Sequence, residues 1–169
     1  MTCMLPINRR APPAPRRRAG REVADRRRWP VARTTYEIRP IGRVESPLTE
    51  RASAPKQGDE GAPDAWLVLE PTLIDGLAGI SAGDEVLVLT WLDRASRDVL
   101  RVHPRGDTSH AVQGVFATRS PDRPNPIGLH RVEIVAIDGC RLLVRNLEAL
   151  DGTPIVDVKP VLSPDVAER

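Results

Sequence analysis

The chain has 169 residues, 40% of them hydrophobic and 28% charged, which is typical of one soluble domain with extensions. Aromatic residues make up only 3% of the sequence, which excludes single-strand nucleic-acid binding by repeated base stacking and predicts an aliphatic core. The net charge of +2 is unevenly distributed, because residues 1–33 hold ten arginines and two acidic residues, so that the remainder is acidic.

The basic segment 1–33 is rich in Arg and Pro and lacks apolar periodicity. Its like-charge clusters, at 16–18 and 26–28, resist compaction, so we expect a disordered arm followed by one domain over residues 34–165. Such an arm suits a nucleic-acid tether, and a merely solvated extension is an equally good interpretation.

Other features of the sequence indicate the cellular compartment and which kinds of site to expect. Cys3 and Cys140 do not indicate a disulfide scaffold, and no apolar run is long enough to span a membrane. The N-terminus has no apolar stretch of the kind found in secretory signals. The three histidines lack metal-ligand spacing. We therefore expect a cytoplasmic protein without metal or membrane attachment.

Short apolar segments separated by turn residues predict a mostly β fold. We expect short helical turns at 73–80 and 146–150, a long polar loop at 46–64, and a hairpin turn at Asp138-Gly139. The expected fold class is a single small β-barrel domain with short helical turns. The predicted strands are 36–45, 65–70, 84–92, 98–103, 112–118, 131–137, 140–145 and 154–158.

The most informative stretch is 114–131, which reads GVFATRSPDRPNPIGLHR. Its three closely spaced prolines leave the loop few conformations, so its polar side chains are held in place before a ligand arrives. Arg119 and Arg123 suit carboxylate or phosphate partners, Asn125 adds an amide, and Gly128 permits close backbone approach. The alternative is a rigid surface loop with solvated arginines.

A second polar stretch, 151–160, reads DGTPIVDVKP. Asp157 and Lys159 face the same side of a predicted strand, where an acid–base pair can hold a polar substrate or shift the pKa of a carboxyl group. The alternative is a surface salt bridge, with Asp151 as an ordinary turn residue. No glycine-rich nucleotide-binding loop and no nucleophile elbow is present.

These two stretches together resemble the signature motifs of the TsaA-like family, also called TrmO or YaeB-like, and the resemblance covers residues 36–162. It implies a β-barrel enzyme that works as a homodimer and transfers a methyl group from S-adenosylmethionine. The activity it implies is N6-methylation of threonylcarbamoyladenosine at position 37 of tRNA, so the implied cofactor is S-adenosylmethionine and the implied partner is tRNA.

The resemblance also implies the cofactor-binding residues. The chain departs from the family pattern in three places. Asp59 follows Gln57-Gly58 where the family has Gln-Pro-Gly, Asp93-Arg94 replaces a His-Gln pair, and the loop after the central strand is shorter than in the best-studied members. These departures leave a small-molecule N-methyltransferase and a non-catalytic S-adenosylmethionine-binding module as alternatives. The implied cofactor contacts are Gln57, Gly58, Asp93, Arg94, Arg119, Leu129, Arg145, Asn146, Leu147 and Glu148.

Methyl transfer to a weakly nucleophilic carbamoylated nitrogen benefits from a carboxylate that removes its proton. We expect Asp151 or Asp157 to be or to orient that base, with Lys159 steadying Asp157. A second set of residues is expected to bind the carboxylate or phosphate of the substrate, namely Arg119, Arg123 and Asn125.

Overall fold

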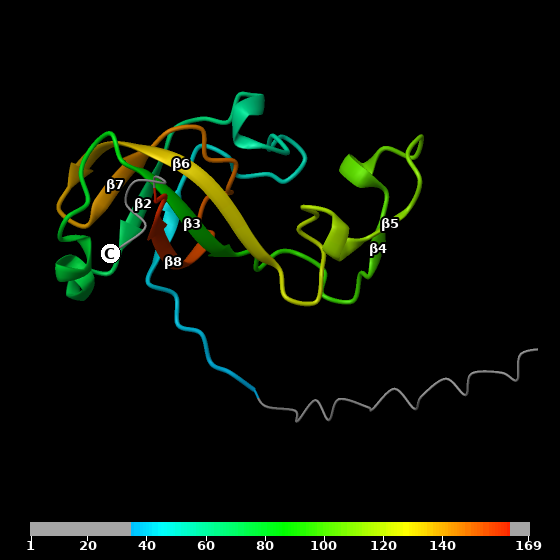
Figure 1. Ribbon diagram of the computed structural model, residues 1–169, viewed down its shortest axis with the longest axis horizontal. Helices are drawn as coiled ribbons and strands as arrows, with labels where there is room; N and C mark the ends of the chain where they lie inside the picture. The colour runs from blue at the N-terminus through cyan, green and yellow to red at the C-terminus, as the bar shows by residue number, and fades with distance from the viewer. Residues whose placement is uncertain (1–34, 163–169) are drawn as a thin grey trace, which may run out of the picture. The chain divides into compact units, whose positions relative to one another are not determined.

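The computed structural model describes residues 35–162, so the predicted arm at 1–33 lies outside the described residues. Within that range the chain forms strands and short 3-10 helices (Figure 1). The strands are β1 (Gly42–Glu45), β2 (Ala65–Leu69), β3 (Glu85–Trp91), β4 (Arg101–Val102), β5 (Gln113–Gly114), β6 (Ile127–Asp138), β7 (Arg141–Val144) and β8 (Pro154–Pro160). The 3-10 helices are η1 (Gly58–Glu60), η2 (Pro71–Leu77), η3 (Pro104–Gly106) and η4 (Val115–Ala117).

Six strands form a closed antiparallel barrel in the order β1-β2-β7-β6-β3-β8. The ring closes because β8 pairs with β3 along one side and with β1 along the other, where Gly42 lies opposite Ile155. The hairpin predicted at Asp138-Gly139 joins β6 to β7. The expected mostly β barrel is confirmed.

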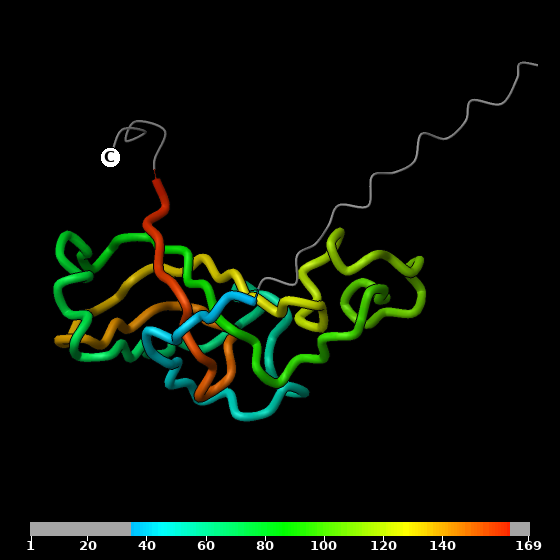
Figure 2. Tube along the Cα trace, turned by 90° about the horizontal axis from the view of Figure 1, so that it is seen from below, coloured from blue at the N-terminus to red at the C-terminus, as the bar shows by residue number. Residues whose placement is uncertain are grey.

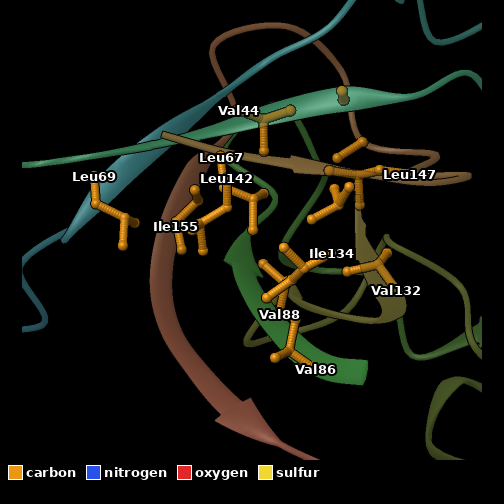
Figure 3. Close-up of a cluster of buried hydrophobic side chains, with 13 residues drawn as sticks. Val44, Leu67, Leu69, Val86, Val88, Val132, Ile134, Leu142, Leu147 and Ile155 are labelled. Carbon is orange, nitrogen blue, oxygen red and sulfur yellow. The ribbon is translucent and has the colours of Figure 1, made fainter. Parts of the chain in front are cut away.

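The core is aliphatic, as the shortage of aromatic residues predicts (Figure 3). Inward and outward residues alternate along the strands, because successive side chains of a strand point to opposite faces. Thus Val86 and Val88 of β3 are buried, and so are Val132 and Ile134 of β6. The segment after β7 also contributes to the core, since Leu147 is fully buried.

Between β3 and β6 the chain leaves the barrel and forms an extension, residues 93–125, which projects to one side (Figures 1 and 2). It contains η3, η4 and a two-stranded sheet of β4 and β5. Asp122 ties the extension to the loop after β1, because its carboxylate accepts two bonds from Arg51 at 2.6 and 3.1 Å. The same carboxylate accepts the backbone N–H of Ser96 at 2.9 Å.

Several predicted boundaries are wrong, each for a local reason. The strand predicted at 98–103 is reduced to β4, whose only partner is the equally short β5. The strand predicted at 112–118 ends at Gly114, and η4 follows, closed by a bond from the Thr118 N–H to the Val115 carbonyl. The helical turn predicted at 146–150 does not form, because Asn146 has a left-handed φ of 54°.

Strand β6, in contrast, is longer than predicted, because it begins at Ile127 rather than at residue 131. Its first residues are paired with β3, with Gly128 opposite Thr90 and His130 opposite Val88. Sequence reasoning assigned these residues to the proline-rich loop. Their place in the barrel puts His130 on its inner face.

Candidate functional site

The proline-rich loop is braced from within by Arg123. Its Nε donates to the Ser120 carbonyl at 2.7 Å, and its Nη2 donates to the carbonyls of Thr118 at 2.7 Å and Val115 at 3.2 Å. Three backbone acceptors therefore occupy a guanidinium that was predicted to bind substrate. The geometry gives Arg123 the task of holding the loop in shape.

Two other predicted residues of this loop remain at the surface. The side chains of Arg119 and Asn125 are exposed. Arg119 lies close enough to Glu148 for its positive charge to lower the pKa of that carboxyl group. The loop therefore presents a cation beside one of the predicted cofactor residues.

The structure brings Gly58 together with Asn146 and Glu148, although nearly ninety residues separate them in the chain. A Cβ at Gly58 would collide with the Asn146 carbonyl oxygen and would lie 3.4 Å from Glu148 Oε2, so only glycine permits this close approach. Gln57 precedes Gly58 at the surface. Two predicted cofactor segments, 57–58 and 146–148, thus meet, and the charge of Arg119 acts on the second of them.

The segment 146–148 is fixed by the start of β2. The Asn146 N–H donates to Asp64 Oδ1 at 3.4 Å, and the Leu147 N–H donates to the Pro63 carbonyl at 3.0 Å. The Leu147 side chain is fully buried in the barrel core, so it anchors the segment and offers a ligand no side-chain contact.

Glu148 is joined to the barrel interior by two residues that sequence reasoning missed. His130 Nδ1 lies 2.8 Å from Glu148 Oε1, and His130 Nε2 lies 2.9 Å from Thr90 Oγ1. We call Thr90, His130 and Glu148 the relay. One signal could have found it: the inward positions of β6 alternate, and His130 is the polar member of that series.

The relay sets the charge of Glu148. Burial raises the pKa of its carboxyl group, but the hydrogen bond from His130 and the charges of His130 and Arg119 outweigh burial, so the pKa lies below its ordinary value. Glu148 is therefore a carboxylate at neutral pH. An ionised acid of lowered pKa is a weak base and suits the binding of donors and cations better than proton abstraction.

The remaining predicted cofactor residues make other contacts. Arg94 donates to the carbonyls of Thr49 at 3.0 Å and Asp151 at 3.4 Å. Arg145 donates to Glu133 Oε2 at 3.3 Å. Among residues 35–162, no hydrogen bond or ion pair joins Asp93, Arg94, Leu129 or Arg145 to the relay. Asp93 and Leu129 are both exposed at the surface.

The predicted catalytic residues fall in two places. Asp151 lines an open surface pocket of about 600 Å³, and its Oδ1 accepts the Ser46 N–H at 3.1 Å. Asp157 lines a different pocket, beside η2, and its Oδ2 lies 2.8 Å from Lys159 Nζ. Both members of that pair are largely exposed, as expected of a surface salt bridge.

The residues around Glu148 fit the amino-acid end of S-adenosylmethionine. Glu148 is a carboxylate on which the positive charge of the Arg119 guanidinium acts, and these two groups complement an ammonium and a carboxylate on the ligand. The Glu148 side chain is 21% exposed, so a bound molecule can reach it.

A metal-binding cluster and a membrane-spanning helix are both absent from residues 35–162. No cluster of three or more His, Cys, Asp and Glu side chains in that range is arranged to hold a metal ion. None of the helices in the described part of the chain is long and apolar enough to cross a membrane.

Comparisons with known proteins agree with the resemblance seen in the motifs. The family model for the tRNA-methyltransferase O N-terminal domain matches residues 43–165. An S-adenosyl-L-methionine-binding protein of Archaeoglobus fulgidus is 46% identical over 129 residues, which cover 76% of this chain and 91% of that protein. A probable S-adenosyl-L-methionine-binding protein of Methanothermobacter thermautotrophicus is 45% identical over 123 residues, which cover 73% of this chain and 88% of that protein.

Solved structures show the same relationship. The crystal structure of TrmO from Pseudomonas aeruginosa matches with a TM-score of 0.63 and 30% identity, over 80% of this chain. The match spans only 60% of the TrmO chain. With the family model matching most of its residues, the chain belongs to the tRNA-methyltransferase O family.

Proposed function

We propose that the protein binds S-adenosylmethionine and methylates N6 of threonylcarbamoyladenosine at position 37 of tRNA. The observation that carries the proposal is the close approach of Gly58 to Asn146 and Glu148, which lie far from it in the chain. The positive charge of Arg119 also acts on the Glu148 carboxylate. Relatives described as S-adenosyl-L-methionine-binding proteins support the cofactor. Membership of a family described as tRNA-methyltransferase O supports the substrate class.

When bound, S-adenosylmethionine supplies an electrophilic methyl group on its sulfonium. Glu148 binds the cofactor's ammonium and Arg119 its carboxylate. The backbone of Gln57 and Gly58 offers further polar groups beside Asn146. Residues that hold both reactants in line can lower the barrier by roughly 7–11 kcal/mol, which is the main contribution that methyl transfer requires.

Asp151 is the base that we favour for the nitrogen proton. Arg94, which occupies a predicted cofactor position, donates to its carbonyl, whereas Asp157 lies beside η2 and is paired with Lys159. One oxygen of Asp151 accepts the Ser46 N–H, and the carboxylate stays exposed at the pocket. Asn125, exposed on the braced loop, contributes an amide for the substrate.

A binding module without turnover is the second candidate, because the chain spans 91% of a relative described only as an S-adenosyl-L-methionine-binding protein. This chain spans only 60% of the longer TrmO chain. Methyl transfer, a tRNA substrate and assembly as a homodimer are therefore parts of the proposal for this protein. A small-molecule N-methyltransferase remains the third, because Asp93-Arg94 departs from the family pattern.

The test is incubation of the purified protein with methyl-labelled S-adenosylmethionine and bulk tRNA, followed by nucleoside mass spectrometry. We expect label in methylated threonylcarbamoyladenosine and none in an unmodified tRNA transcript, the matched control. Cofactor binding without label in any nucleoside would favour the binding module. A small-molecule enzyme would show a shallow salt dependence of substrate binding, whereas a tRNA enzyme shows a steep one.

A further inference from the structure

The relay has the order hydroxyl, imidazole, carboxylate, which is also the order of the hydrolytic triads. Here the hydroxyl cannot act as a nucleophile, because Thr90 is fully buried and no substrate can reach it. His130 is only 6% exposed. Glu148, the outermost member, is the one a ligand can touch, so whatever the relay does is expressed through this carboxylate.

The imidazole is locked by its surroundings. Gly128 lies beside it, and a Cβ at that position would collide with Thr90 Oγ1, lie 2.7 Å from His130 Nε2 and lie 3.2 Å from Leu92. The ring therefore fills the space that glycine leaves. Its two nitrogens are fixed on two partners, so it has a single orientation in the packed barrel.

The hydrogen-bonding roles follow from the partners. A carboxylate only accepts, so Nδ1 of His130 carries the proton donated to Glu148 Oε1. Nε2 is paired with the Thr90 hydroxyl, which can either donate or accept. This arrangement leaves Oε2 of Glu148 facing Gly58, on the side where the predicted cofactor segments meet.

We propose that His130, held by Thr90, is a positioning residue that fixes the Glu148 carboxylate for S-adenosylmethionine binding. The inference rests on the proposed cofactor site and adds two buried residues to it. Its physical basis is preorganisation: a carboxylate that already has one orientation loses less entropy when a ligand binds. His130 acts only through Glu148 and touches neither cofactor nor substrate.

Two substitutions separate positioning from packing. In His130→Asn the amide nitrogen takes the place of Nδ1 and can still donate to Glu148, whereas in His130→Gln the amide reaches toward Thr90 and the donor to Glu148 is lost. Both remove the ring, so both lower the melting temperature. Titration calorimetry of the full chain with S-adenosylmethionine should show Kd raised about tenfold or more in His130→Gln and mostly restored in His130→Asn, as a lost hydrogen bond to a charged group predicts.

A double-mutant cycle completes the test. In a Glu148→Gln background, His130→Gln should add little further loss of affinity, because its effect acts through the charged carboxylate. Glu85→Gln, which removes a carboxylate paired with Arg131 on the barrel surface, is the control and should leave Kd unchanged.

Failure of the positioning role can be distinguished from failure of the proposed cofactor binding. Equal Kd values in His130→Asn and His130→Gln, or a full loss in the Glu148→Gln background, would overturn the positioning role while leaving the cofactor site intact. No binding of S-adenosylmethionine by the unaltered protein would overturn the proposed function and this inference with it.

Discussion

Glu148 and Asp151 lie three residues apart in the chain and have different environments. Glu148 is largely buried, bonded to His130 and near the charge of Arg119. Asp151 is exposed, lines an open pocket and accepts one backbone N–H, from Ser46. The segment between the buried Leu147 and β8 therefore presents two carboxylates with different surroundings.

The difference assigns different chemistry to the two groups. A carboxylate held ionised by its partners binds charge but accepts protons poorly. A carboxylate in contact with solvent can take a proton and release it to water, as a general base must. In the proposed function, environment rather than residue type thus divides cofactor binding by Glu148 from proton transfer by Asp151.

Asp151→Asn should have the largest effect. It keeps the bond from the Ser46 N–H, since the amide oxygen can accept it, but removes the basic carboxylate. Turnover on tRNA at saturating S-adenosylmethionine should fall by roughly 10²–10⁴, the usual contribution of a general base, with Kd for the cofactor unchanged. Asp157→Asn, the control, should keep nearly normal turnover; a reversed pattern would make Asp157 the base.

Gly128→Ala should disturb the packing around Thr90 and His130 and so lower the stability of the barrel. The added methyl group meets Thr90 Oγ1, His130 Nε2 and Leu92, so overpacking should lower the free energy of unfolding by about 1–3 kcal/mol. Gly114→Ala is the matched control, because its Cβ would meet nothing within 4 Å and its φ is −66°. Urea unfolding measures both, and equal stability of the two variants would refute the close packing around His130.

Acid should reduce the contribution of Glu148 to the free energy of unfolding. Its pKa in the folded protein lies below the ordinary 4.5, so its contribution to stability is complete above that value and is lost as pH falls through the folded pKa. The advantage of the unaltered protein over Glu148→Gln in urea unfolding should therefore shrink over the range in which the pH falls from the ordinary 4.5 through the lower folded pKa. A constant advantage across this range would show that the carboxyl group is not held ionised.

The barrel was predictable because alternation is a local property. Val86 and Val88 in one strand, and Val132 and Ile134 in another, mark inner faces without knowledge of their partners. The family was predictable from long motifs, and the family model confirms it. The order of the strands in the ring came only from the structure.

The relay was not predictable in the same way. Thr90 lies 40 residues from His130, and Glu148 lies 18 residues beyond it, so their pairing depends on the register of β3 with β6 and on the path of the chain after β7. Arg123 shows the converse limit. Its charge suggested a ligand, but the loop's own carbonyls were the nearer partners.

The closure of the barrel by β8 has a consequence for biosynthesis. Without β8 the five remaining strands form an open sheet whose free edges are β1 and β3, and β8 is the strand that covers both. A chain growing at roughly 5–20 residues per second therefore carries two unpaired edges until Pro160 has left the ribosome. Those edges are templates for pairing with other chains, so the synthesis of β8 also ends the period in which aggregation through these edges competes with folding.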